Sequence, residues 1–423
     1  MADALAAKGL VRETAPVRRA REIANFQARA PKFHAPDLSN PNEAGWTLLY
    51  HEADIEIAGL FDRLVNARDG KTFVMKAGES AADFLSRWGA LERRPYYVLI
   101  AAPPDRIPFS LQNILDCAVG RVWFEDPRNF STYISGLLRS EDEKLDCVTS
   151  KRAVFFATDY DDVTWISREY LAEPLCKLAR MESFETTYIG GPEATSGRLR
   201  EAVARRDHGR GAALLFSATH GAALDRADPV QREIQGALVC NDELFSARDI
   251  QGDVALPYGI GFFFACYGAG TPSNSDFTLW CPDYRDQLQQ YVPDQDFLAA
   301  LPLRLLSHSE PALAVVAHID PAWMHSFVDT KTWQPRLNPF VTGIQRILQG
   351  APVGYAMREF TSLCSRYNSL LLDLQIRFVQ SRDEKTEPEP ILDDRLFGTW
   401  IRRTDAQHYM IVGDPAARLN FAV

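Results

Sequence analysis

Two short apolar segments each end at a side chain that can take part in nucleophilic catalysis. The segment AALLFSATHG leads to His220, and the segment GIGFFFACYGAG leads to Cys266. Small residues follow both side chains, so a substrate backbone can approach closely. A thiol needs help to become a nucleophile at neutral pH, and an imidazole from a neighbouring strand supplies it. The pair therefore predicts a cysteine-dependent acyl-transfer or hydrolytic enzyme.

Each residue of the pair has a catalytic role and a plainer structural alternative. His220 would accept or share the thiol proton and later protonate the leaving amine, while the Cys266 thiolate attacks the scissile carbonyl. The backbone N–H groups of Gly221 and Cys266 are the expected oxyanion donors. Alternatively, the cysteine is a packed apolar residue and the histidine is held by a loop carbonyl. Their equivalent positions at two strand ends favour catalysis.

Other polar side chains are expected near the pair. Three acidic residues follow the apolar run RAVFFA, namely Asp159, Asp161 and Asp162. Asp159 is nearest to the strand end and would pair with an Arg or Lys of a substrate; a solvated acidic loop is the alternative. Trp323 would form an apolar pocket wall, or it merely packs. His318 is a rival base, but His220 is favoured because a glycine follows it.

The remaining motifs do not indicate a cofactor or a metal ion. The segment GGPEATSG, at 190–197, lacks the Lys-Ser/Thr of a phosphate-binding loop and does not fit G-x-G-x-x-G. The histidines His308, His318 and His325 are too scattered for a zinc site, and H-E-x-x-H is absent from the sequence. Cys240 is expected to be packed, with a secondary reactive thiol as the alternative. We therefore expect neither cofactor nor metal.

Composition describes an ordinary folded chain of 423 residues that carries a net charge of −10. That charge argues against binding to nucleic acid or to an anionic membrane surface, and it favours a cationic substrate. The first residues form no apolar signal segment, and no run approaches the roughly 18 apolar residues of a membrane span. The seven cysteines are an odd number without C-x-x-C pairing. These features predict a cytoplasmic protein.

The pattern of elements predicts how these side chains are positioned. A basic arm, 1–44, precedes a smaller α/β subdomain at 45–148, a catalytic α/β domain at 149–350, and a C-terminal part, 351–423, with a long helix and closing strands. Apolar runs without alternation are typical of strands covered by helices on both faces, so the sheet should be mostly parallel. Ligands bind beyond the carboxyl ends of such strands, where His220, Cys266, Asp159 and His318 all fall.

The two motifs together resemble a known family. The strand–SATHG and strand–ACYGAG order is similar to that of clan CD cysteine peptidases, which include caspases, separase, CHAT-domain peptidases and gingipain-like peptidases. The block YYVLIAAPPDRIPFSLQNILDCAVGRVWFEDPRNF and the terminal IVGDPAARL resemble the gingipain-like group most. The resemblance covers about residues 90–423. It implies a caspase-like fold with His220 as base and Cys266 as nucleophile.

The chain also departs from this family. The signal and pro-segments of secreted gingipains are missing, and Phe264 and Ala265 replace the acidic residue that metacaspases place before the cysteine. The resemblance implies an intracellular endopeptidase acting on a protein substrate, under the control of an activating or inhibiting protein partner, as in bacterial defence or programmed cell death. Two alternatives stay open: a catalytically silent scaffold of the same fold, and another thiol enzyme such as an acyltransferase.

Overall fold

The computed structural model divides into two units, Met1–Asp37 and Leu38–Val423. It describes residue 19 and the ranges 36–142, 149–204, 211–280, 285–383 and 390–421. The predicted arm, 1–44, therefore lies almost entirely outside the described residues. All the elements considered below belong to the second unit.

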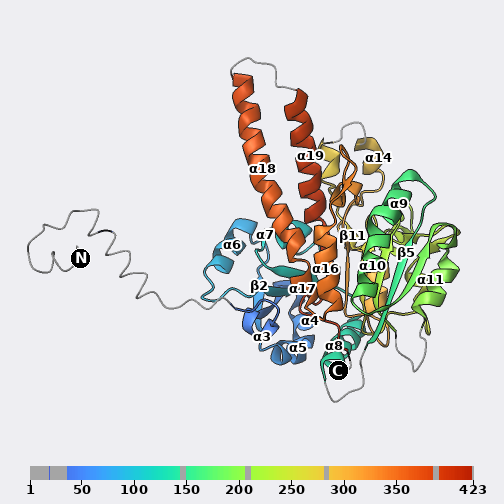
Figure 1. The fold of residues 1–423 in the computed structure, drawn as a ribbon. Helices are drawn as coiled ribbons and strands as arrows, with labels where there is room; N and C mark the ends of the chain where they lie inside the picture. The colour runs from blue at the N-terminus through green and yellow to red at the C-terminus, as the bar shows by residue number, and fades with distance from the viewer. Residues whose placement is uncertain are drawn as a thin grey trace, which may run out of the picture. The chain divides into compact units, whose positions relative to one another are not determined.

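A ten-stranded sheet forms the centre of this unit (Figure 1), in the order β2-β1-β3-β4-β16-β13-β10-β7-β5-β6. The strands are β1 (Trp46–His51), β2 (Lys71–Met75), β3 (Tyr97–Ile100), β4 (Ala118–Arg121), β5 (Ser150–Ala157), β6 (Glu185–Gly190), β7 (Ala212–Ala218), β10 (Ile260–Phe264), β13 (Ala314–His318) and β16 (Tyr409–Gly413). Every neighbouring pair is parallel except β13 with β16. The predicted mostly parallel α/β fold is confirmed.

Strand β16 joins two halves of the sheet that run in opposite directions. It is parallel to β4 on one side and antiparallel to β13 on the other. The strands of the predicted first subdomain and those of the predicted catalytic domain therefore share one continuous sheet. The proposed boundaries at 45–148, 149–350 and 351–423 stay a prediction.

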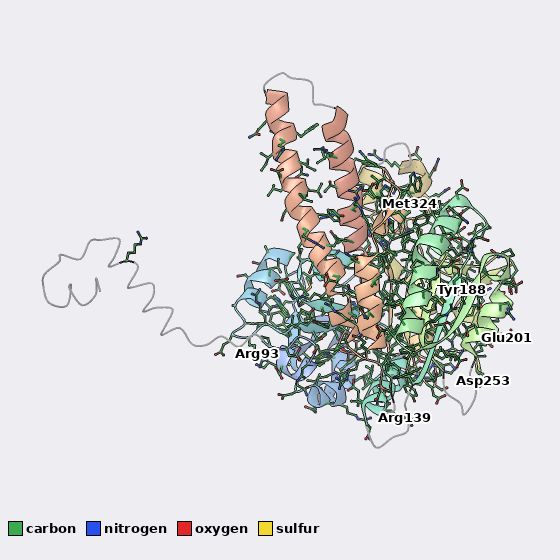
Figure 2. The ribbon with its side chains drawn as sticks, in the orientation of Figure 1. Arg93, Arg139, Tyr188, Glu201, Asp253 and Met324 are labelled. Carbon is green, nitrogen blue, oxygen red and sulfur yellow. The ribbon has the colours of Figure 1, made fainter. Side chains whose placement is uncertain are left out.

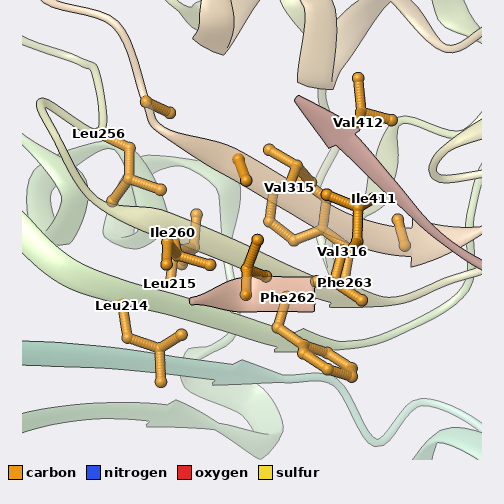
Figure 3. Packing of buried hydrophobic residues seen from close by; sticks show 14 of the residues in the cluster. Leu214, Leu215, Leu256, Ile260, Phe262, Phe263, Val315, Val316, Ile411 and Val412 are labelled. Atoms are coloured by element: carbon orange, nitrogen blue, oxygen red, sulfur yellow. The ribbon is translucent and has the colours of Figure 1, made fainter. Parts of the chain in front are cut away.

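The strands that lead to the candidate site are buried on both faces. All residues of β7, β10 and β13 are buried, which explains why their sequences AALLFSA, IGFFF and AVVAH do not alternate in polarity. Figure 3 shows their side chains packed together with those of β16. Phe216 lies between Phe155 and Phe262, with ring centroids 5.6 and 5.5 Å apart. Such aromatic pairs add about 0.5–1.5 kcal/mol each beyond area burial.

Helices pack around this sheet. Helix α10 (Glu173–Met181) packs against α16 (Asn338–Leu348), and the two lie side by side in Figure 1. Helix α11 (Ser196–Val203) contacts β5 and β6, and α15 (Ala300–Leu306) contacts β13. None of the helices in the described ranges is both long and apolar enough to span a membrane.

A helical hairpin, α18 (Arg358–Asp383) with α19 (Pro390–Gln407), extends away from the sheet (Figure 1). The long first helix was expected from the sequence, but the expected closing strand pair is wrong, because α19 precedes a single strand, β16. At the base of the hairpin, η7 (Met324–Ser326) packs against α19, and Figure 2 labels Met324 there. A small apolar cluster joins this base to the body, formed by Phe277, Leu371, Leu396, Trp400 and Ile401.

Candidate active site

The predicted histidine and cysteine follow adjacent strands in the same register. Strands β7 and β10 are parallel, and Ala218 pairs with Phe264. The Thr219 N–H donates to the Phe264 carbonyl at 3.2 Å, which continues the pairing beyond the strand ends. His220 and Cys266 are the second residues after this last pair. The sheet therefore brings the two side chains to one edge, as the strand-end argument required.

Gly221 lies directly against the backbone of Cys266. A Cβ added to Gly221 would be 1.8 Å from the Cys266 carbonyl oxygen, so no other residue fits without moving the chain. The backbone N–H of Gly221 is directed at the Cys266 sulfur. The Gly221 N–H therefore lies beside the sulfur, and its role as an oxyanion donor stays a prediction.

His220 is oriented by a carboxylate that the sequence did not single out. Its Nε2 lies 2.7 Å from Oδ2 of Asp161. Asp161 caps helix α9 (Asp162–Ser167) and accepts the N–H of Thr164 at 2.8 Å. Burial raises the pKa of Asp161, but the hydrogen bonds from Thr164 and His220 outweigh it, so the pKa lies below its usual value. An ionised Asp161 therefore fixes the imidazole orientation and leaves Nδ1 for proton transfer.

A tyrosine completes the surroundings of the imidazole. The ring of Tyr160 lies 5.7 Å from that of His220. Burial raises the pKa of Tyr160 to about 12, and the nearby Asp161 carboxylate acts in the same direction. The phenol is therefore neutral at physiological pH and can donate a hydrogen bond. Nothing in the sequence marked it, because its role depends on the turn between β5 and α9.

Cys266 is partly buried and its sulfur is held by backbone groups. The Ala322 N–H donates to Sγ at 3.3 Å. Burial raises the pKa of the thiol, and the N–H groups of Ala322 and Gly221 only partly oppose it. The free protein therefore holds a neutral thiol at pH 7, and its ionisation requires a base such as His220.

The loop after Cys266 is held in a conformation that ordinary residues rarely adopt. Tyr267 has φ +58° and Asp320, in the facing loop, has φ +91°. The Tyr267 N–H donates to the Asp320 carbonyl at 3.2 Å, and the Ala269 N–H donates to the His318 carbonyl at 2.9 Å. Backbone strain of this kind persists only where surrounding contacts fix it, and it concentrates at functional sites.

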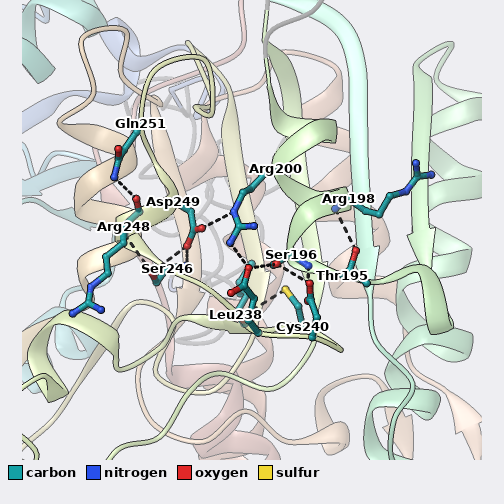
Figure 4. A network of polar contacts seen from close by, with 12 residues as sticks. Thr195, Ser196, Arg198, Arg200, Leu238, Cys240, Ser246, Arg248, Asp249 and Gln251 are labelled. Carbon is teal, nitrogen blue, oxygen red and sulfur yellow. Dashed lines mark hydrogen bonds and ion pairs between the residues drawn. The ribbon is translucent and has the colours of Figure 1, made fainter.

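A polar network on the other side supports the loop that carries His220. The hairpin of β8 (Leu238–Val239) and β9 (Leu244–Phe245) pairs with this loop, and the Val239 N–H donates to the His220 carbonyl at 3.0 Å. Figure 4 shows Arg200 of α11 at the centre of the network. Arg200 contacts Glu243 and Asp249, each at 2.6 Å. Glu243 thus anchors the hairpin to α11, and Asp249 anchors the turn that follows the hairpin.

Asp159, the predicted pocket floor, already faces a cation. Its Oδ2 lies 3.4 Å from Nε of Arg168, and a Cβ on Gly191 would lie 3.0 Å from it. Arg168 also pairs with Glu169 and Glu173. A basic substrate side chain would have to compete with Arg168 for this carboxylate. The structure brings Asp161, not Asp159, to His220.

Trp323 packs toward the helical hairpin. Its ring centroid lies 5.4 Å from that of Phe277, and it belongs to the apolar cluster at the hairpin base. Its backbone N–H donates to Oδ1 of Asp405 at 2.9 Å. These contacts match the packing alternative. The residue next to it, Ala322, is the one that contacts the Cys266 sulfur.

His318, the rival base, is fully buried at the end of β13. Nδ1 lies 3.1 Å from the Asp320 carbonyl and Nε2 lies 3.0 Å from the Asp405 carbonyl. Burial lowers the pKa of His318, but the Asp405 carboxylate and these carbonyls more than offset it, so the net shift is upward. An imidazolium that donates from both nitrogens has a structural role.

The other candidate groups offer no second site. Cys240 is buried, and burial raises its pKa to about 12, which makes it unreactive at neutral pH. Within the described ranges, no group of three or more His, Cys, Asp and Glu side chains is arranged to hold a metal ion.

Comparison with solved structures finds proteins with a similar fold. The chain is similar to the Arg-specific cysteine proteinase gingipain R (RgpB), with a TM-score of 0.53 and 12% identity, over 91% of this chain and 80% of that chain. A complex of the pro- and mature domains of Porphyromonas gingivalis RgpB matches with a TM-score of 0.52 and 12% identity, over 89% and 79%. A structure described as a protease matches with a TM-score of 0.52 and 10% identity, over 93% of this chain and 81% of that chain.

These neighbours share the caspase-like fold of clan CD, which confirms the resemblance read from the sequence at the level of fold. No protein-family model and no curated protein matches the chain. At such low identity the likeness does not by itself assign activity, so function must be argued from the site.

Proposed function

We propose that this chain is a cysteine endopeptidase with Cys266 as nucleophile and His220 as acid–base group. The observation that carries the proposal is that Cys266 and His220 follow adjacent strands in the same register, at the carboxyl edge of the sheet, with His220 oriented by Asp161. The N–H groups of Gly221 and Cys266 would stabilise the oxyanion. Asp161 would act as a positioning residue.

In the proposed mechanism, His220 carries protons between the Cys266 sulfur, the substrate amine and water. His220 takes the thiol proton through Nδ1 as the Cys266 sulfur bonds to the substrate carbonyl carbon. The tetrahedral intermediate collapses, the C–N bond breaks, and the departing amine takes the proton from His220. His220 then removes a proton from water as the water oxygen attacks the thioester carbon. The C–S bond breaks, the Cys266 sulfur takes that proton back from His220, and the free carboxylic acid leaves. The partly buried neutral thiol is thus activated only when a substrate is aligned.

Substrate preference is the finer part of the proposal. The structural neighbour is described as Arg-specific, and the net charge of −10 favours a basic substrate. We propose cleavage after Arg or Lys with Asp159 as the recognition carboxylate. Because Arg168 already faces Asp159, we expect weaker selectivity than an unpaired carboxylate would give.

Covalent labelling tests the catalytic assignment. An acyloxymethyl-ketone probe carrying Arg or Lys should label the parent protein, and Cys266→Ala should abolish labelling. Cys240→Ala is the matched control, because this buried thiol should not react. Absence of labelling in the parent would instead support a silent scaffold, and labelling without peptide hydrolysis would support an acyltransferase. Control by a protein partner, a role in defence or cell death, and a cytoplasmic location stay predictions.

A further inference from the structure

A cavity lies at the base of the helical hairpin, next to the segment that contacts the Cys266 sulfur. It has a volume of about 410 Å³, which is within the range typical of small-molecule sites. It lies between α18, α19, the start of α16 and the segment that follows η7. The side chains used below are Arg336, Arg366, Arg402, His325, Phe360 and Tyr367.

The cavity gathers three arginines, of which one is paired with a carboxylate. Arg366 and Arg402 form no ion pair within the described part of the chain, and Nε of Arg402 is buried there without a hydrogen-bond partner. Arg336 pairs with Asp329. Burial lowers the pKa of Arg402, and repulsion from Arg336 adds to this. Burial also lowers the pKa of His325, and repulsion from Arg402 and Arg336 adds to this. Such a cluster is stabilised by an anion.

The two carboxylates that also line the cavity are committed elsewhere. Glu359 pairs with Arg346 at 3.4 Å. Asp405 accepts the N–H of Trp323 and the hydroxyl of Ser326, and it faces His318 at 3.3 Å. The charge that is open to a ligand is therefore positive, in a chain whose net charge is −10. This contrast indicates a local site, not a general basic surface.

The walls of the cavity favour a ligand with a ring. The aromatic side chains of Phe360, Tyr367 and Tyr409 line it, and so do Leu337 and Pro339. Phe360 also packs against Tyr409, with ring centroids 4.5 Å apart. A planar ring can stack on such faces while a phosphate binds guanidinium groups in a bidentate manner. A nucleoside monophosphate combines both features at about the size of this cavity.

The same cavity is connected to the candidate active site through Asp405. Ser326 and Asp405 line it, and Asp405 fixes the backbone N–H of Trp323. The preceding residue, Ala322, donates its N–H to the Cys266 sulfur. An anion held by the arginines would repel the Asp405 carboxylate and accept a hydrogen bond from Ser326, which would shift this segment and change the contact with the sulfur.

We propose that this cavity binds a nucleoside monophosphate, with Arg366 and Arg402 on the phosphate and the base against Phe360 and Tyr367, and that occupancy alters the reactivity of Cys266. The regulatory half of this proposal rests on the proposed function, whereas the binding half does not. Arg366 and Arg402 would be ligand-binding residues outside the catalytic group.

Calorimetry tests binding directly. The full chain is titrated with AMP, GMP, CMP and UMP, and with inorganic phosphate. We expect at least one nucleotide to bind with Kd below about 1 mM and phosphate alone to bind at least tenfold more weakly. Arg366→Gln and Arg402→Gln should each weaken binding at least tenfold, while Arg395→Gln, an exposed position on α19 outside the cavity, should bind as the parent does. Failure of all four nucleotides, or unchanged affinity in both cavity variants, would overturn the site.

A thiol-alkylation rate tests the coupling. Iodoacetamide modification of Cys266, followed by mass spectrometry, does not require peptidase activity. Saturating nucleotide should change this rate at least threefold in the parent and not in Arg366→Gln. If the nucleotide binds but the alkylation rate does not change, the regulatory half of the proposal is overturned and the binding half stands. Cys266→Ala should keep the parent affinity, so failure of the peptidase assignment is distinguishable from failure of this one.

Discussion

The neutral Cys266 thiol and the Asp161–His220 pair divide the work of activation. Burial keeps the sulfur protonated in the free protein, while Asp161 holds the imidazole in place. In the proposed mechanism the thiolate would form only in the presence of an aligned substrate, which would limit unwanted alkylation or oxidation. This division depends on one hydrogen bond of 2.7 Å between partly exposed side chains.

Removal of the Asp161 charge should impair catalysis without removing the nucleophile. We expect Asp161→Asn to lower kcat/KM by about 10- to 100-fold, mainly through kcat, because the imidazole loses its orienting carboxylate. Asp159→Asn is the matched control, and we expect it to alter preference for Arg or Lys substrates more than kcat on neutral ones. Steady-state kinetics with paired fluorogenic peptides measures both. Equal losses in the two variants would contradict the assignment.

Sequence reasoning singled out Cys266 and His220, whose catalytic role stays a prediction, but not the carboxylate that contacts His220. Cys266 and His220 were found because each ends an apolar run and precedes small residues, a local pattern. Asp161 was missed because three acidic residues lie within four positions of each other, and only the start of α9 decides which one faces His220. Tyr160 and Ala322 act through tertiary geometry and carry no sequence signal.

At the scale of elements, the register of β7 with β10 determines the site. Parallel pairing of Ala218 with Phe264 sets His220 beside Cys266, and a slip by one residue would send one of the two side chains to the other face. The close approach of Gly221 to Cys266 fixes this register beyond the strand ends. The hairpin β8–β9 supports the same loop from the far side.

An added methyl group at Gly221 should therefore separate the two loops. We expect Gly221→Ala to reduce covalent labelling of Cys266 by at least tenfold, because its Cβ would lie 1.8 Å from the Cys266 carbonyl oxygen. Gly197→Ala, in α11, is the control, since a Cβ there meets nothing within 4 Å. That control should label normally and gain about 0.5–1 kcal/mol of stability. Normal labelling of Gly221→Ala would contradict the described contact.

The helical hairpin marks the limit of sequence reasoning about elements. Helix α18 was predicted from its length and periodicity, whereas α19 was not, because it contains Gly398 and follows a polar Glu/Pro segment. Its helical state is stabilised by two contacts. Trp400 packs against Phe277, with ring centroids 5.5 Å apart, and α19 packs along α18. Such tertiary contacts override the local propensity of the chain.

At the scale of the whole molecule, one buried carboxylate ties the last strand to the first. Asp414 is fully buried and lies 2.7 Å from Arg68, and its Oδ1 accepts the Trp46 indole N–H at 2.9 Å. Its own N–H donates to the Tyr133 hydroxyl at 2.7 Å. Burial lowers the pKa of Arg68, but Asp414 and Glu141 more than offset it and raise it.

Breaking this pair should destabilise the whole chain. Asp414→Asn leaves the buried Arg68 with Glu141 alone, and we expect a loss of about 3–5 kcal/mol in urea unfolding. Asp126→Asn is the control, because Asp126 pairs with an exposed Arg128 and asparagine also caps a helix. Its unfolding midpoint should match that of the parent. An unchanged free energy of unfolding in Asp414→Asn would contradict this expectation and show that Glu141 alone compensates the charge of Arg68.

Stability should also fall as pH rises from about 6.5 to 8. Burial raises the pKa of Asp320 to about 8 from an ordinary value of 3.8, so the folded chain holds a proton that the unfolded chain has lost. The raised pKa of His318 acts in the same direction above 6.5. Burial lowers the pKa of His408, which contributes only below its ordinary value of 6.5. Each extra proton changes the unfolding free energy by about 1.4 kcal/mol per pH unit.

The variant Asp320→Asn isolates one of these protons. Asparagine mimics the protonated acid and tolerates the positive φ of this position. We expect a shallower fall of the urea midpoint between pH 6.5 and 8 in the variant than in the parent. Identical slopes would show that Asp320 is ionised throughout.

The placement of β16 in the middle of the sheet has a consequence for biosynthesis. Until residues 409–413 leave the ribosome, β4 and β13 are open edges, and the chain behind His220 and Cys266 lacks the neighbour that secures His318. A nascent chain would therefore carry both reactive residues before its sheet is closed. If the site works as proposed, we expect peptidase activity to appear only after β16 has closed the sheet, which would protect the nascent chain from cleaving itself.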